Sequence, residues 1–245
     1  MSDKVNLDRR QFLGTASAAI AGFAIAPGLF LYDFANARPT GGAASAGVRW
    51  GMLIDSTLCQ SSCNDCVSAC NKEHDLPAAK SPTDVQWIRK VELKQISTGR
   101  QISLPMMCLH CAEPPCVDVC PTQASFKRAD GIVLVDKHRC IGCRYCMMAC
   151  PYKARSFVHE AVLSHDGEMP RGQGTVESCT LCDHRVDRGE QPACVEACAK
   201  AGHSAMLFGD LNNPDSEIYR RVRSVASTQL RADLGLNPNI SFVGL

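Results

Sequence analysis

The chemistry of this 245-residue chain is concentrated in its 16 cysteines, far more than a hydrophobic core needs. They fall into four groups of four, and each group ends in two cysteines separated by three residues. The groups are Cys59, Cys63, Cys66 and Cys70; Cys108, Cys111, Cys116 and Cys120; Cys140, Cys143, Cys146 and Cys150; and Cys179, Cys182, Cys194 and Cys198. This usage predicts thiolates that bind metal, form cross-links, or both, and the repetition indicates duplication of one unit.

The third group has the most specific spacing. It reads C-x2-C-x2-C-x3-C-P, which is typical of bacterial ferredoxin segments that hold [4Fe–4S] clusters. In that arrangement three thiolates bind one cluster and the fourth binds its neighbour, so clusters come in pairs. Gly142 lets the backbone turn tightly between ligands, and Pro151 redirects the chain after the last one. The sequence therefore predicts paired cubane clusters.

The remaining groups vary this pattern and leave alternatives open. The second reads C-x2-C-x4-C-x3-C-P, and the fourth reads C-x2-C-x11-C-x3-C, which taken alone also suits tetrahedral zinc. The first has one extra residue after Cys59. Either its loop bulges and all four cysteines bind, which we favour, or Cys59 is displaced and a three-iron cluster or another ligand results. A disulfide-linked or zinc-bound structural protein is the alternative from a different class.

Other cofactor and catalytic motifs are absent from the sequence. It contains no C-x-x-C-H for covalent haem, no phosphate-binding glycine loop, no G-x-S-x-G and no H-E-x-x-H. His110 and His184 each follow a cysteine by two positions, but the second half of a Rieske motif is missing. We expect both to be loop residues that tune a cluster potential at most. The pattern predicts an electron carrier without a catalytic residue.

Charge and composition narrow the range of partners. The formal charge is +1, lysine and arginine are scattered, and aromatic residues reach only 6%, so no nucleic-acid partner is expected. Four clusters at about −2 each would bring the protein to about −7. Several basic residues near cysteines could offset that charge, although each taken singly is expected to be ordinary solvated surface. They are Arg139, Arg144, Lys153, Arg155 and Arg185.

The N-terminal segment predicts export. Asp8-Arg9-Arg10-Gln11-Phe12-Leu13 precedes an apolar stretch, and Ala35-Asn36-Ala37 fits a small-residue cleavage site. Paired arginines followed by Phe-Leu resemble the bacterial twin-arginine signal, so we predict a signal peptide over residues 1–37 and a periplasmic location. A break at Pro27-Gly28 makes a transmembrane span the weaker interpretation. Because that route moves folded proteins, it favours clusters loaded in the cytoplasm over disulfides.

The elements between the cysteines are expected to be short. Because such pieces bury little apolar area, clusters should supply much of the stability. The expected fold class is α+β, with tandem bacterial-ferredoxin-like domains of two [4Fe–4S] clusters each, short strands, short helices and long loops. The predicted elements are strands at 52–55, 133–136 and 205–208, a hairpin over 85–96 and 101–107, and a helix at 67–72.

Along nearly its whole mature length, the chain resembles a known family. These are the four-cluster ferredoxin-like subunits that accompany molybdopterin oxidoreductases and polysulfide-reductase-type membrane quinone proteins. The matching strings are Gly51–Asp55, Cys108-Leu-His-Cys-Ala-Glu-Pro-Pro-Cys116, Cys140-Ile-Gly-Cys143, Cys150-Pro-Tyr and the tail Leu230–Val243. In lacking an added C-terminal membrane helix, the chain is similar to the exported ferredoxin-like subunit of the membrane complex of dissimilatory sulfur metabolism. The runner-up is the electron-transfer subunit of a periplasmic molybdopterin reductase for tetrathionate or polysulfide.

The resemblance implies how the cysteines are shared among four [4Fe–4S] clusters, because in this family group one pairs with group four and group two with group three. The implied ligands are Cys59, Cys63, Cys66 and Cys198 (set 1); Cys70, Cys179, Cys182 and Cys194 (set 2); Cys108, Cys111, Cys116 and Cys150 (set 3); and Cys120, Cys140, Cys143 and Cys146 (set 4). The implied domains are a linker at 38–47, an outer domain at 48–104 plus 158–212, an inner domain at 105–157, and a tail at 213–245 that packs on the domains or a partner.

The same resemblance implies the partners. One is an integral-membrane, quinone-interacting subunit of the polysulfide-reductase type. A multihaem cytochrome c or a molybdopterin subunit would be the other redox neighbour. On this interpretation the protein lies in the periplasm and is attached to the cytoplasmic membrane through the complex.

Overall fold

The computed structural model describes residues 44–162 and 171–245, which include all sixteen cysteines. The predicted signal peptide and most of the predicted linker lie outside the described residues. The described part belongs to one compact unit, in which the larger of two apolar cores joins residues from both predicted ferredoxin-like segments. The domain boundaries inside this unit stay a prediction.

The largest sheet has four strands in the order β8-β1-β10-β9. At its centre β1 (Trp50–Asp55) pairs antiparallel with β8 (Met206–Asp210) and parallel with β10 (Ile240–Val243), which in turn pairs antiparallel with β9 (Ser227–Thr228). Residues 51–54 of β1 are all buried, as expected for a central strand covered on both faces. The strands predicted at 52–55 and 205–208 are confirmed, and the tail contributes two strands, β9 and β10, that the sequence did not predict.

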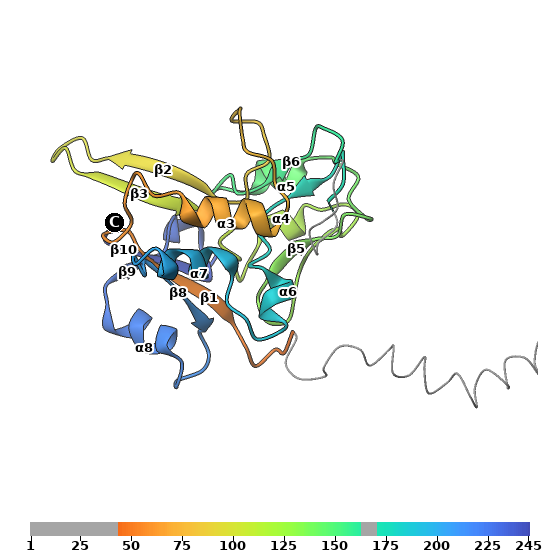
Figure 1. Cartoon of the computed structure of the whole chain (residues 1–245). Helices are drawn as coiled ribbons and strands as arrows, with labels where there is room; N and C mark the ends of the chain where they lie inside the picture. Colours follow the sequence, from red (N-terminus) through yellow and green to blue (C-terminus); the bar gives the residue numbers. More distant parts are fainter. Residues whose placement is uncertain (1–43, 163–170) are drawn as a thin grey trace, which may run out of the picture. The chain divides into compact units, whose positions relative to one another are not determined.

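Three two-stranded antiparallel hairpins complete the β-structure. The predicted long hairpin is present as β2 (Arg89–Lys94) and β3 (Gln101–Met106), and it projects away from the rest of the described chain (Figure 1). The predicted strand at 133–136 is β5 (Val133–Val135), which pairs with β4 (Ser125–Lys127). The shortest pair is β6 (Ser156–Phe157) with β7 (Val176–Glu177). These hairpins follow or precede cysteine loops and set their entry points.

The helices are short, and most of them carry cysteines. Helix α3 (Asp65–Glu73), which contains the predicted helix, lies beside α7 (Ala193–Lys200), as Figure 1 shows. Asp65 in the first turn of α3 and Lys72 in its last turn suit the helix dipole. The other helices are α4 (Pro115–Asp118), α5 (Tyr145–Ala149), α6 (Asp183–Val186), α8 (Glu217–Ser224) and the 3-10 turn η1 (Ala232–Leu234).

The hydrophobic core is built around cysteine side chains. Trp87, Leu109 and Phe242 are among its fully buried members, and many of the buried cysteines belong to the same cluster of contacts. A smaller core brings Cys116 and Cys146 together with Val133 and Val176. Since apolar residues surround the thiols directly, whatever binds the sulfur atoms is part of the interior. Within the described ranges, no helix has the length and apolar character that crossing a membrane requires.

Candidate metal centres

Three cavities are each lined by four cysteines, and each set of four matches one that the resemblance groups together. Set 1 lines one of these cavities, set 3 the second and set 4 the third. Each set takes three thiols from one group and one from its partner group. Four sulfur donors that converge on one buried space fit a cubane iron–sulfur cluster.

The thiols of set 2 are recognised by their mutual electrostatics. Burial raises the pKa of Cys179 well above its ordinary value, and Cys70, Cys194 and Cys182 raise it further. The pKa of Cys194 is raised in the same way by burial and then by Cys182 and Cys70. All four thiols of set 2 are buried, as are all four of set 3.

The C-x3-C step places consecutive thiols near different sets. Cys66 and Cys70 are four residues apart on α3, as Cys194 and Cys198 are on α7. Side chains at this spacing lie on one face of a helix, one turn apart. One helix can therefore serve two adjacent clusters, and the contact between α3 and α7 brings the two such pairs together. This explains the shared spacing at the ends of groups one and four.

Burial keeps most of these thiols protonated unless a cation binds them. It raises the pKa of Cys66 to about 11 and that of Cys111 to about 12, and nearby thiols contribute to both increases. Iron binding must therefore displace protons from the sulfur atoms, so cluster assembly and folding are coupled. All sixteen cysteines are free thiols, and Cys143 in set 4 is the only one of them that is exposed.

Backbone amides point at several of the sulfur atoms. Ser125 N donates to Cys120 Sγ at 3.4 Å, and Val176 N donates to Cys140 Sγ at 3.4 Å, both in set 4. In set 1, Ala205 N donates to Cys198 Sγ at 3.3 Å. Such hydrogen bonds stabilise negative charge on sulfur and are one of the factors that set a cluster's reduction potential.

The extra residue after Cys59 is accommodated by a lysine that the sequence analysis missed. Lys90 on β2 donates to Cys59 Sγ at 3.3 Å, to Gln60 O at 2.7 Å and to Cys63 O at 3.1 Å. Cys59 stays on the cavity of set 1 beside the other three thiols. This geometry fits a loop that bulges while all four cysteines bind. In the sequence Lys90 looks like an ordinary lysine of a partly exposed strand. Only the folded structure shows that its ammonium group binds the loop of Cys59.

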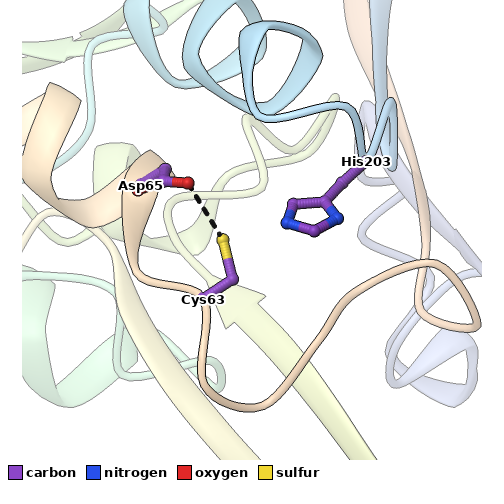
Figure 2. A group of neighbouring side chains, drawn as sticks. All are labelled: Cys63, Asp65 and His203. Atoms are coloured by element: carbon purple, nitrogen blue, oxygen red, sulfur yellow. Dashed lines mark hydrogen bonds between the residues drawn. The ribbon is translucent and has the colours of Figure 1, made fainter.

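A second group of donors lies at the edge of set 1. Figure 2 shows Cys63, Asp65 and His203, whose donor atoms lie within 4.8 Å of one another. Cys63 Sγ donates to Asp65 Oδ2 at 3.4 Å, and His203 also lines the cavity of set 1. These residue types suit a transition metal. Because the same sulfur belongs to set 1, an independent ion here would compete with the cluster.

The basic residues near the cysteines differ sharply in their surroundings. Lys153 and Arg139 are exposed as expected, and exposed Arg144 stacks on the ring of Phe157 at 3.9 Å. Arg185 is half-buried and pairs with carboxylates of Glu73 and Glu196.

Arg155 is the exception, because only 5% of its surface is exposed. The expectation that it is solvated surface is wrong. Arg155 lies between the loop of Cys150 and the first residue of β6. Its side chain lines the cavity of set 3.

Three histidines lie against the cluster sites without extending any ligand set. His110 is fully buried and accepts a hydrogen bond from Val133 N through Nδ1 at 3.0 Å. Burial, with Arg155 nearby, lowers its pKa to about 3, so it is neutral. His74, which the sequence analysis did not select, lies 3.3 Å from Cys182 Sγ through Nε2. His184 instead contacts Glu73 Oε1 at 2.8 Å.

Comparisons with known proteins agree with this chemistry. Residues 100–211 match the 4Fe-4S dicluster domain family. The chain is 39% identical to the Hdr-like menaquinol oxidoreductase iron-sulfur subunit 1 of Archaeoglobus fulgidus, over 98% of both chains. It is 36% identical to the B subunit of tetrathionate reductase from Salmonella typhimurium, over 98% of this chain and 90% of the relative. Protein NrfC of Escherichia coli is also 36% identical, over 79% of this chain and 80% of that protein.

The fold and the grouped thiols define a ferredoxin-like iron–sulfur protein that carries four [4Fe–4S] clusters. The chain belongs to the family of iron–sulfur electron-transfer subunits of oxidoreductase complexes. It is therefore an electron-transfer subunit and not the catalytic subunit of its complex. When bound, the clusters accept and release single electrons, and the protein fixes their positions and surroundings.

Proposed function

We propose that this protein carries electrons between a membrane quinone-interacting subunit and a redox partner on the periplasmic side of a complex of dissimilatory sulfur metabolism. Its role would correspond to that of DsrO in the DsrMKJOP complex, with a multihaem cytochrome c among the neighbours. The twin-arginine pattern at Arg9-Arg10 supports export. The full-length similarity to a subunit named for a menaquinol oxidoreductase supports a quinone-linked complex.

The observation that carries the proposal is the convergence of four thiols on each of three cavities. We assign sets 1 to 4 as the ligands of clusters 1 to 4. Adjacent sets lie close together: Cys66 of set 1 and Cys70 of set 2 are one turn apart on α3, and Cys116 of set 3 packs in one small core with Cys146 of set 4. These contacts support two pairs of neighbouring clusters between which electrons can hop.

Within this path the protein has three tasks. It holds each cluster with four thiols, it buries all the thiols of sets 2 and 3, and it leaves the edge of set 4 accessible at Cys143. Amide donors at Cys120, Cys140 and Cys198 stabilise the sulfur charge. None of these tasks requires a proton donor or a nucleophile, which is consistent with an electron carrier.

A second candidate is the electron-transfer subunit of a periplasmic molybdopterin reductase. It is favoured by the 36% identity to the tetrathionate reductase relative, which extends over 98% of this chain. The neighbouring genes discriminate between the two. Genes for a multihaem cytochrome and a quinone-interacting membrane subunit support the first proposal, and a gene for a large molybdopterin subunit supports the second.

The ligand assignment is tested on anaerobically purified protein by iron analysis and by EPR after reduction. We expect about sixteen irons per chain, and about four fewer in each single-set disruption such as Cys146→Ala when the rest of the protein assembles. Four irons or fewer in the native protein would contradict the four-cluster assignment. Export is tested separately with Arg9→Lys and Arg10→Lys combined, which should retain the precursor in the cytoplasm. Unchanged periplasmic accumulation would contradict the twin-arginine assignment.

A further inference from the structure

Arg155 is a buried cation without a conventional counter-ion. It is 5% exposed and lines the cavity of set 3 together with the four thiols of that set. Its Nε, Nη1 and Nη2 atoms are all buried, and in residues 44–162 and 171–245 none of them donates to an oxygen or nitrogen atom. Nor does any carboxylate of those residues form an ion pair with it, as carboxylates do with Arg128, Arg171 and Arg185.

An isolated guanidinium in a protein interior costs several kcal/mol unless an opposite charge compensates it. The groups that act most strongly on Arg155 are the thiols of Cys116, Cys108 and Cys146. Burial by itself lowers the pKa of Arg155, but these sulfur atoms outweigh that effect and raise it. Cys108 and Cys116 belong to set 3, whereas Cys146 belongs to set 4. Arg155 lines the cavity of set 3, and Cys116 of that set packs in the same small core as Cys146 of set 4. The guanidinium therefore lies where the two sets come together.

We propose that Arg155 is a fixed counter-ion shared by clusters 3 and 4, and that its charge raises the reduction potential of both. The inference rests on the proposed ligand sets. One electron enters a cluster on reduction and changes the charge of the cluster with its four thiolates from about −2 to about −3. No bond forms or breaks in this chain and no proton is transferred. A positive charge in a medium of low dielectric stabilises the more negative state, which is the reduced one.

The test is a potentiometric titration of purified holoprotein, with dithionite as reductant and EPR detection of the reduced clusters. In Arg155→Gln, two of the four reduction waves should move together, each with an equilibrium constant for reduction at least about tenfold lower, which is about 59 mV for one electron. The reduction waves of clusters 1 and 2 should move less, with equilibrium constants for reduction that change by less than about twofold.

Lys153→Gln is the matched control. It removes the same charge two positions away, but from an exposed side chain, where water screens it. All four waves should stay within about twofold of the native protein. The proposal is overturned if Arg155→Gln leaves all waves in place, shifts one alone, or shifts them no more than Lys153→Gln does.

Arg155→Lys separates charge from shape. The variant retains a cation but not the planar fork of the guanidinium, so it should keep the full iron content. The equilibrium constants for reduction of clusters 3 and 4 should stay within about threefold of those of the native protein. If Arg155→Gln fails to assemble, Arg155→Lys still decides the matter. Equal loss of iron in both variants would mean that guanidinium shape and not charge is required. Iron content of the native protein below about sixteen would instead refute the ligand assignment itself.

Discussion

At the scale of single residues, this protein depends on side chains that shape the cysteine loops as much as on the cysteines. Gly142 and Lys90 illustrate two ways of doing so. Gly142 removes bulk at a point where two loops meet, and Lys90 supplies three hydrogen bonds to a loop that is one residue too long. Both roles are local, so each can be tested by one substitution with its effect confined to one cluster.

Gly142→Ala should prevent assembly of cluster 4. Gly142 has φ +70°, and a Cβ there would overlap the carbonyl oxygen of Gly174. Left-handed backbone costs about 1–2 kcal/mol for an L-residue, and here the clash adds to it. Iron analysis should show about four irons fewer per chain. Gly189→Ala is the control, because its φ is +78° but a Cβ meets nothing within 4 Å. Equal iron content in the two variants would show that the overlap is harmless.

Lys90→Met should make cluster 1 labile at Cys59. The variant removes the ammonium that holds Cys59 Sγ and two carbonyl groups of the loop. On exposure to air, EPR should show the signal of an oxidised three-iron cluster that the native protein lacks. Lys94→Met removes an exposed lysine from the same strand and should behave like the native protein. A four-iron cluster 1 of native stability in Lys90→Met would remove the lysine from this role.

At the scale of elements, the central sheet connects the cluster-binding loops to the tail. Strand β1 leads into the first cysteine loop, and β8 follows the last cysteine of the fourth group. Strand β10 pairs with β1 over four registered positions, including Ile54 with Phe242. The expectation is that the tail at 213–245 packs on the domains or on a partner; within the described residues it adds strands β9 and β10 to the largest sheet. The sheet should therefore control the stability of clusters 1 and 2.

Phe242→Ala should destabilise the protein by about 3–5 kcal/mol, because the ring is fully buried and the sheet cannot collapse around the space it leaves. Visible absorption that bleaches on heating reports the loss of clusters, and the bleaching temperature should fall. Ser241→Ala changes a half-buried residue on the opposite face of the same strand and should have little effect. Identical bleaching temperatures for the two variants would contradict a structural role for β10.

At the scale of the whole described unit, a buried ion-pair network joins the two halves of the cluster framework. Arg128, in the β4–β5 turn, binds Asp130 at 2.7 Å and Asp187 at 2.5 Å, and Asp183 lies 3.8 Å away. The turn belongs to the segment between cysteine groups two and three. Asp183 lies in α6 and Asp187 follows it, and both are within cysteine group four. One guanidinium therefore holds together parts of the chain that bind different pairs of clusters.

Arg128→Met should cost about 3–5 kcal/mol, because it leaves the fully buried Asp130 carboxylate without its cation. The free energy loss should appear as faster cluster bleaching in denaturant. Arg231→Met is the control, since Arg231 and Asp233 form an exposed pair of the kind that contributes at most about 1 kcal/mol. Comparable bleaching rates for the two variants would mean that the network adds no stability.

The sequence predicted the cluster chemistry and the short strands well because both are encoded locally. The spacing of Cys140 to Cys150 specifies a cluster loop, and alternating apolar residues specify β2 and β3. It could not predict that β10 inserts beside β1, because that pairing joins segments far apart in the chain. Nor could it distinguish Arg155 from Lys153: both are basic residues after the same cysteine, and only the fold buries one of them.

The parallel pairing of β1 with β10 has a consequence for biosynthesis. The first strand of the described unit acquires its parallel neighbour only when residues 240–243 have left the ribosome. A truncated or stalled chain can therefore present the proposed N-terminal signal but cannot complete the sheet beneath the first cysteine loop. A transport route that accepts only folded cargo would reject such fragments, so completeness of the polypeptide would be checked before it leaves the cytoplasm.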